Sequence, residues 1–146
     1  MPANRIAVDA NVMVHALYRD APQHANSRPF LERAQQGHLT LCFTSQTLAE
    51  FFSIVTSAKR VSDARTPQEA VGAIQSILSL PGATLLPVPA AVTSRWLDLF
   101  SRHPVRAGAI FDLQLIATLM TNGVDRVCPL NRPDFEGFPG LRVMTP

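Results

Sequence analysis

Short apolar runs alternate with longer helical segments along the chain, and this alternation limits the fold more than any other feature. Five runs have the length and composition of buried strands, and they cover residues 5–10, 39–43, 84–88, 126–130 and 141–144. Strands that alternate with helices form right-handed crossovers and a mainly parallel sheet. The sequence therefore predicts an α/β fold, in which a central sheet of about five strands is covered by helices on both faces.

The helices expected between these runs have recognisable ends. Thr66-Pro-Gln-Glu69 combines a capping box with proline at the first helical position and predicts a helix to about residue 80. Pro29 interrupts the segment 22–36, which indicates a kinked helix or a start near Asn26. Asn11 is a possible N-cap. The other helices are expected at 11–18, from Thr44 or Ser45 to 58, at 89–102, and from a start at or near Asp112 to 122, with connectors at 59–65 and 103–109.

The composition fits one compact domain spanning residues 1–146. The chain has 146 residues, of which 47% are hydrophobic and 16% charged, and a net charge of +2, which is compatible with a nucleic-acid partner but not specific for one. Cys42 and Cys128 lie in apolar runs and are expected to be buried free thiols. No leader peptide is evident and no apolar run reaches the ~20 residues of a membrane span. We therefore expect a cytoplasmic protein without a membrane partner.

Three acidic residues lie in runs that otherwise predict buried core. They are Asp9 in Ile6-Ala-Val-Asp-Ala, Glu50 in Leu48-Ala-Glu-Phe-Phe, and Asp112 in Ala109-Ile-Phe-Asp-Leu. Acidic side chains are rarely buried unless they are paired or bind a metal. In isolation, Asp9 could be a helix cap, Glu50 a surface residue and Asp112 an N-cap. Together they predict a hard-metal site at the carboxyl ends of the strands, where sites form in open parallel sheets.

Four short motifs, around Asp9, Glu50, Asp112 and Asn131, follow one another along the chain and together resemble those of the PIN domain family. Asp9-Ala-Asn11 after the first strand resembles the opening motif, and Ser45-Gln-Thr-Leu-Ala-Glu50-Phe resembles the second. Gly108-Ala-Ile-Phe-Asp112 resembles the third and Leu130-Asn-Arg-Pro-Asp134-Phe the fourth. Motif order, spacing and length are most similar to the VapC toxins of bacterial toxin–antitoxin pairs.

This resemblance implies a three-layer α/β/α PIN-like fold and an endoribonuclease that depends on Mg²⁺ or Mn²⁺. The partners it implies are an RNA substrate, a small antitoxin protein and a second copy of the chain. Asp9, Glu50 and Asp112 match the acidic metal-site positions, and Asn11 matches a polar residue that supports them. The fourth catalytic position, often Asp in the family, is Asn131 here, which lends an oxygen but no charge. Asp134 could supply the missing charge or lie on the surface.

The chemistry of phosphodiester hydrolysis agrees with these expectations, because a divalent cation lowers the pKa of bound water and neutralises phosphate oxygens. Asp9 and Asp112 are the expected direct ligands, and Glu50 either binds the metal or orients the attacking water. Arg106 could contact the scissile phosphate or be a loop arginine, and the basic segment 59–65 could bind the RNA backbone or be a solvated connector.

Two other functions remain open at this stage. A non-catalytic nucleic-acid-binding module would keep the fold, and Asn131 favours it. A metal-dependent phosphohydrolase is the other alternative, although Asn11 stands where an aspartyl-phosphate phosphatase usually has a second Asp. Phe30 and Leu31 of the early helices could serve an interface with a partner, although core packing is the simpler expectation.

Overall fold

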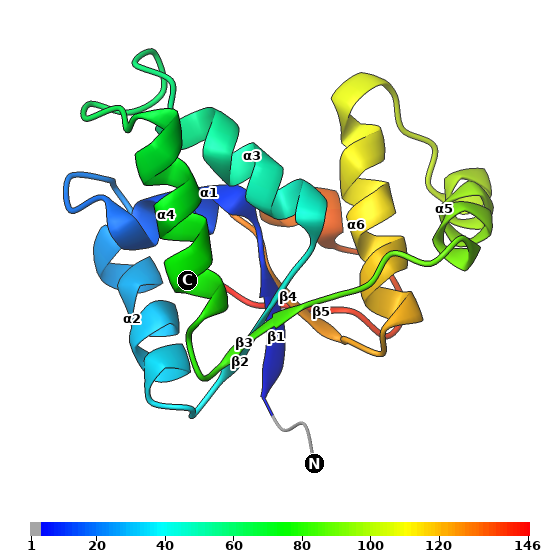
Figure 1. Ribbon diagram of the computed structural model, residues 1–146. Coiled ribbons are helices and arrows are strands. Elements are labelled where there is room, and N and C mark those ends of the chain that lie inside the picture. Colours follow the sequence, from blue (N-terminus) through cyan, green and yellow to red (C-terminus); the bar gives the residue numbers. More distant parts are fainter. Residues whose placement is uncertain (1–3) are drawn as a thin grey trace.

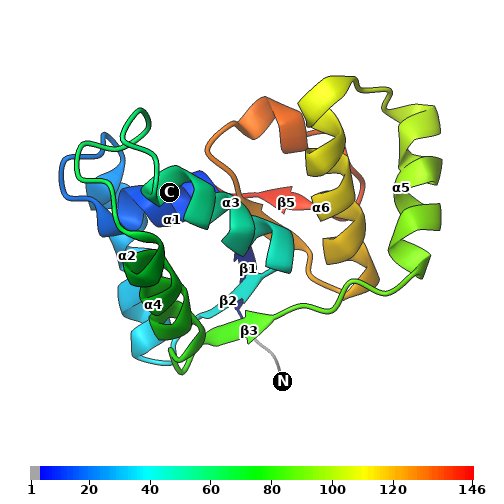
Figure 2. The same ribbon diagram turned by 45° about the horizontal axis from the view of Figure 1, so that its top comes forward.

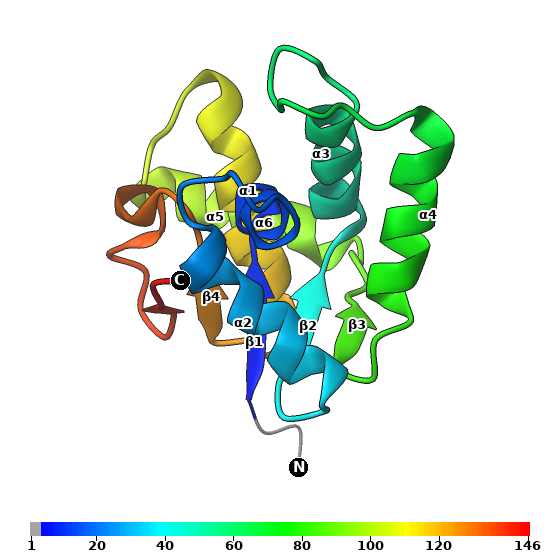
Figure 3. The same ribbon diagram turned by 90° about the vertical axis from the view of Figure 1, so that its left-hand side faces the viewer.

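Five parallel strands form the central sheet of the computed structural model, which describes residues 4–146 (Figure 1). The strands are β1 (Arg5–Val8), β2 (Thr40–Phe43), β3 (Ala83–Leu85), β4 (Arg126–Cys128) and β5 (Arg142–Val143). Their order across the sheet is β3-β2-β1-β4-β5, and every neighbouring pair is parallel. Figure 3 shows β1, β2 and β3 side by side. The predicted mainly parallel sheet of about five strands is thus confirmed.

Helices cover both faces of this sheet. The α-helices are α1 (Ala10–Leu17), α2 (His24–Gln35), α3 (Ser45–Val55), α4 (Pro67–Leu78), α5 (Ala91–Arg102) and α6 (Ile110–Thr121), and the 3-10 helices are η1 (Ala107–Ala109) and η2 (Arg132–Phe135). Figures 1 and 2 agree in placing α1 to α4 on one side of the sheet and α5 and α6 on the other. The predicted three-layer α/β/α arrangement is confirmed.

The strand residues divide between two apolar cores because successive side chains point to opposite faces. Ile6 and Val8 of β1 pack with the α1–α4 layer, whereas Ala7 packs with the layer that contains α5 and α6. Leu31 is buried in the first core and Phe30 packs against that core. Both residues therefore pack in the core, which was the simpler of the two expectations.

The helix starts correct one sequence prediction and confirm another. The N-cap of α1 is Asp9 rather than Asn11, because the Asp9 carboxylate accepts a hydrogen bond from the Val12 backbone N–H. Asn11 already lies inside the helix. At α4, the capping box of Thr66 and Glu69 is present as predicted.

Two segments that contain proline show how far a helix and a strand extend. The helix α2 begins at His24 and continues through Pro29. Pro29 has no N–H to donate to the carbonyl of Ala25, four residues earlier, and Ala25 is exposed. The strand β3 ends at Leu85, two residues before Pro87, which has no N–H to donate to the sheet. In the predicted connector 103–109, residues 107–109 form η1.

Cys42 and Cys128 are buried free thiols, as predicted. Among residues 4–146, no helix is long and apolar enough to cross a membrane.

Candidate functional site

Asp9 lies where β1 ends and α1 begins, and both of its carboxylate oxygens accept backbone hydrogen bonds. Oδ1 accepts from the Val12 N–H at 2.9 Å, and Oδ2 accepts from the Leu130 N–H at 2.7 Å. Burial raises the pKa of Asp9, while the backbone donors lower it in part. The second hydrogen bond joins two segments 121 residues apart, so Asp9 fixes the position of the chain that follows β4.

Glu50 lies on the exposed side of α3, which begins after Thr44 at the end of β2. The Thr44 hydroxyl caps this helix by accepting from the Thr47 N–H at 3.1 Å. One turn before Glu50, Gln46 donates its amide N–H to Glu50 Oε1 at 3.0 Å. This contact holds one carboxylate oxygen of Glu50 and leaves the other free of partners among residues 4–146.

Asp112 stands in the first turn of α6 but is not its N-cap, because Ala109 occupies that position. Its carboxylate is half-buried and accepts no hydrogen bond from residues 4–146. Burial is the largest cause that raises the pKa of Asp112 to about 6, and the charges of Asp134, Glu50 and Asp9 raise it further. Asp112 is therefore close enough to three other carboxylates for their charges to disfavour its own.

The fourth acidic position comes from the segment after β4. Asn131 precedes η2 and donates its amide N–H to Asp134 Oδ2 at 2.6 Å. Phe135, the next residue, is 3% exposed and anchors η2 to the core. Because Asp134 acts on Asp112 through its charge, it faces the other acids and does more than cover the surface. Asn131 and Asp134 thus lie together, with the amide holding the carboxylate.

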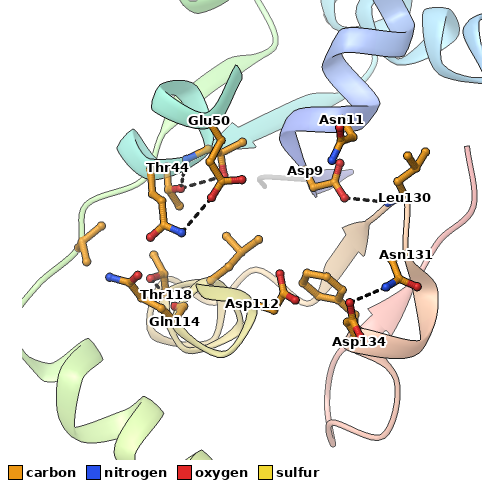
Figure 4. A pocket seen from close by; sticks show the side chains of 15 residues that line it. Asp9, Asn11, Thr44, Glu50, Asp112, Gln114, Thr118, Leu130, Asn131 and Asp134 are labelled. Atoms are coloured by element: carbon orange, nitrogen blue, oxygen red, sulfur yellow. Dashed lines mark hydrogen bonds between the residues drawn. The ribbon is translucent and has the colours of Figure 1, made fainter. Parts of the chain in front are cut away.

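These side chains line one cavity of about 370 Å³ (Figure 4). Six of the seven residues singled out from the sequence line it: Asp9, Asn11, Glu50, Asp112, Asn131 and Asp134. Arg106 does not line it and lies exposed before η1. Sequence reasoning missed the uncharged polar lining residues Thr44, Gln46, Thr47, Gln114 and Thr118. Only Gln46, one helical turn before Glu50, had a spacing that could have indicated its role.

The chemistry of the cavity suits a divalent cation. Four carboxylates and four carboxamides line it, and no Lys, Arg or His from residues 4–146 does. The protein therefore offers oxygen ligands of the kind that Mg²⁺ and Mn²⁺ prefer, without a basic side chain to offset their charge. In the positions described, no three His, Cys, Asp or Glu side chains of residues 4–146 are arranged to hold one ion together. Binding would therefore require these side chains to draw closer around the ion.

Comparison with known proteins gives consistent matches. A model of the PIN domain family matches residues 6–129. Ribonuclease VapC43 of Mycobacterium tuberculosis is 33% identical over 81 residues, which are 56% of this chain and 55% of that protein, so the chain spans about half the length of this relative. Ribonuclease VapC24 of the same organism is 25% identical over 142 residues, covering 97% of this chain and 96% of the relative.

The fold also resembles a solved structure. The crystal structure of VapBC2 from Rickettsia felis, bound to a DNA fragment from their promoter, contains a chain that superposes with a TM-score of 0.66. The two chains are 17% identical, and the match covers 97% of this chain and 98% of the other. At this identity the likeness concerns the fold alone.

Proposed function

Because this chain belongs to the PIN domain family, we propose that it is a divalent-metal-dependent endoribonuclease that hydrolyses RNA phosphodiester bonds. The convergence of Asp9, Glu50, Asp112 and Asp134 on one cavity carries the proposal. The names of the relatives, which are ribonucleases, support the same reaction.

Asp9 and Asp112 are the residues we assign as direct ligands of Mg²⁺ or Mn²⁺. When bound, such an ion neutralises the carboxylates and the phosphate oxygens of the substrate and lowers the pKa of water. Asp9 is pre-oriented by its two backbone donors, whereas Asp112 has no partner among residues 4–146 and can turn toward an ion. Asn11, beside Asp9, adds a polar group to the cavity wall.

Glu50 has one carboxylate oxygen fixed by Gln46, and the other can orient the attacking water or bind the metal. We assign the fourth acidic position to Asp134 and a positioning role to Asn131, whose amide holds Asp134 Oδ2. With this assignment, Asp134 supplies the fourth carboxylate, which Asn131 cannot provide. Arg106 has no part in this proposal, because it lies outside the cavity.

We further propose that the enzyme is the toxin of a cytoplasmic toxin–antitoxin pair and acts as a homodimer. The motifs that resemble VapC toxins and the fold shared with a chain of the Rickettsia felis VapBC2 structure support the pair. Phe111, next to Asp112, is 53% exposed, and burial of its ring would favour contact with a second copy. The free thiols of Cys42 and Cys128 suit a reducing cytoplasm.

The decisive experiment is cleavage of single-stranded RNA by purified protein. We expect cleavage with Mg²⁺ or Mn²⁺, none with EDTA, and strong loss in Asp112→Asn. The matched control is Asp63→Asn, which removes an exposed acid from the connector between α3 and α4. Cleavage that continues with the metal fully chelated would refute the metal mechanism. Efficient cutting of single-stranded DNA with RNA untouched would overturn the substrate assignment.

A further inference from the structure

The cavity has two chemically different ends. Carboxylates gather at the end formed by the segments that follow β1 and β4, where Asp9 and Asp134 lie. The other end, which we call the Gln114 end, is formed by the segment after β2 and by the inner side of α6. The uncharged side chains Thr44, Gln114 and Thr118 lie there, with Glu50 as the one carboxylate, beside Thr44 (Figure 4). The sheet order β3-β2-β1-β4-β5 separates these two groups, because β1 and β4 are neighbours and β2 lies on the other side of β1.

Most polar groups at the Gln114 end already form hydrogen bonds within the protein. The Thr44 hydroxyl donates to Thr47 Oγ1 at 3.0 Å and accepts from the Thr47 N–H. Thr118 donates its hydroxyl to the Gln114 carbonyl oxygen at 2.8 Å, and Gln46 donates to Glu50. The hydroxyl hydrogens of Thr44 and Thr118 and one N–H of Gln46 are therefore used in hydrogen bonds within the cavity wall and are not available to a ligand.

The side-chain amide of Gln114 is different. It is half-buried, lines the cavity and has no hydrogen-bond partner among residues 4–146. An amide offers one acceptor and two N–H donors. Val88 and Leu115 add apolar surface to the same cavity. The Gln114 end thus combines a free amide donor and acceptor with apolar walls, which is the composition of a small-molecule pocket with a few placed polar groups.

We propose that the Gln114 end is a nucleobase subsite in which Gln114 reads the edge of a base next to the cleaved bond. The proposal rests on the proposed ribonuclease function, since it places the scissile phosphate at the acidic end. With the Glu50 carboxylate and no basic side chain among the described lining residues, the Gln114 end does not favour a phosphate group. A base, in contrast, can place its flat faces against Val88 and Leu115 and its edge against the amide. Proteins recognise unstacked RNA bases by such edge contacts.

The contact should confer base selectivity. A glutamine that makes two hydrogen bonds to one base edge discriminates against the wrong base. The bases present different donor and acceptor patterns, and adenine matches an amide through its N6 donor and N7 acceptor. We therefore expect adenine at this position to be preferred. Methionine has nearly the shape of glutamine without the amide, so Gln114→Met should remove the preference and leave α6 intact.

The first test measures binding without cleavage. Side-chain amide signals are followed by NMR in EDTA-containing buffer while adenosine, guanosine, cytidine or uridine is added to the full chain. We expect a saturable shift of the Gln114 amide signal, largest with adenosine, and no shift for Gln75, which is exposed on α4. A Gln114 signal that none of the nucleosides moves would overturn the subsite. The largest shift with another nucleoside would overturn the adenine preference.

The second test sequences the RNA ends produced with Mn²⁺ from a randomised pool. We expect Gln114→Met to reduce the preference at the position next to the cut by about tenfold, while Gln75→Met and the wild type share one profile. If the cleavage profile of Gln114→Met equals that of the wild type, the proposed base subsite is refuted but the proposed ribonuclease function is not. If the wild type cuts no RNA, the proposed function fails instead, and the nucleoside titration still decides whether the cavity binds a base.

Discussion

Replacing Asp112 with asparagine should make the metal-free protein more stable at alkaline pH. The Asp112 carboxylate is half-buried, faces three other acids and accepts no hydrogen bond from residues 4–146. Its negative charge therefore lowers the free energy of unfolding whenever no cation is bound. Asparagine has the same shape and removes that charge, and no hydrogen bond is lost from the described structure.

The magnitude follows from the pKa of Asp112, which rises from 3.8 to about 6 on folding. Between these values the folded chain binds more protons than the unfolded chain, so stability falls as the pH rises and the full cost is reached above pH 6. At about 1.4 kcal/mol per pH unit the cost has an upper bound of about 3 kcal/mol. Because solvent screens a half-buried carboxylate, we expect about 1 kcal/mol, or roughly 3 °C in the melting temperature.

Thermal unfolding followed by circular dichroism provides the assay. Wild type and Asp112→Asn are treated with EDTA, exchanged into metal-free buffer and melted at about pH 8 and about pH 4. The gain should appear at the higher pH and be nearly absent at the lower one, where folded Asp112 is already protonated. Asp63→Asn controls for the loss of one exposed negative charge. A variant that is no more stable at pH 8, or that gains as much at pH 4, would refute the proposed repulsion.

Three further predictions concern the neighbouring residues. Asp9→Asn should cost about 1 kcal/mol in the free energy of unfolding, because the new amide cannot accept from both backbone donors and the Leu130 N–H loses its partner; urea unfolding with no loss would contradict this. Mn²⁺ should raise the melting temperature of the wild type and raise that of Asp112→Asn much less, since a ligand that prefers the folded chain stabilises it; an equal rise would count against Asp112 as a ligand. Asn131→Asp should destabilise the metal-free protein above pH 6 by placing a second charge beside Asp134, and should tighten Mn²⁺ binding in calorimetry; unchanged binding would leave Asn131 with a purely structural part.

The parallel fold could be predicted because its main signals are local. Each strand is a short apolar run, and each crossover helix has its own cap or stop, as at Thr66 and Glu69. The ends of the elements depend on contacts that the sequence does not display. The predicted strand 126–130 stops at Cys128 in the structure because the Leu130 N–H donates to Asp9, which is 121 residues away.

The acidic half of the site was predictable for a different reason. A charged carboxylate is unexpected in an apolar run, because burial of its charge is costly, and Asp9, Glu50 and Asp112 all lie in such runs. Asp134 lies in the mixed segment Asn131-Arg-Pro-Asp-Phe-Glu136 rather than in an apolar run, so nothing local distinguished it from a surface acid. Gln114 also lies in an apolar run, between Leu113 and Leu115, but a neutral amide in such a run is a weaker sign of a site than a charged carboxylate.

The hydrogen bond from the Leu130 N–H to Asp9 also determines when the site can exist during synthesis. Asp9 emerges from the ribosome first, but its Oδ2 partner and Asp134 belong to the last fifth of the chain. A nascent chain that ends before residue 126 has no β4 to pair with β1, and the carboxyl edge of its sheet has only three of the four acids. Translation must therefore pass residue 134 before this protein can have the complete acidic cavity with which we propose it cuts RNA.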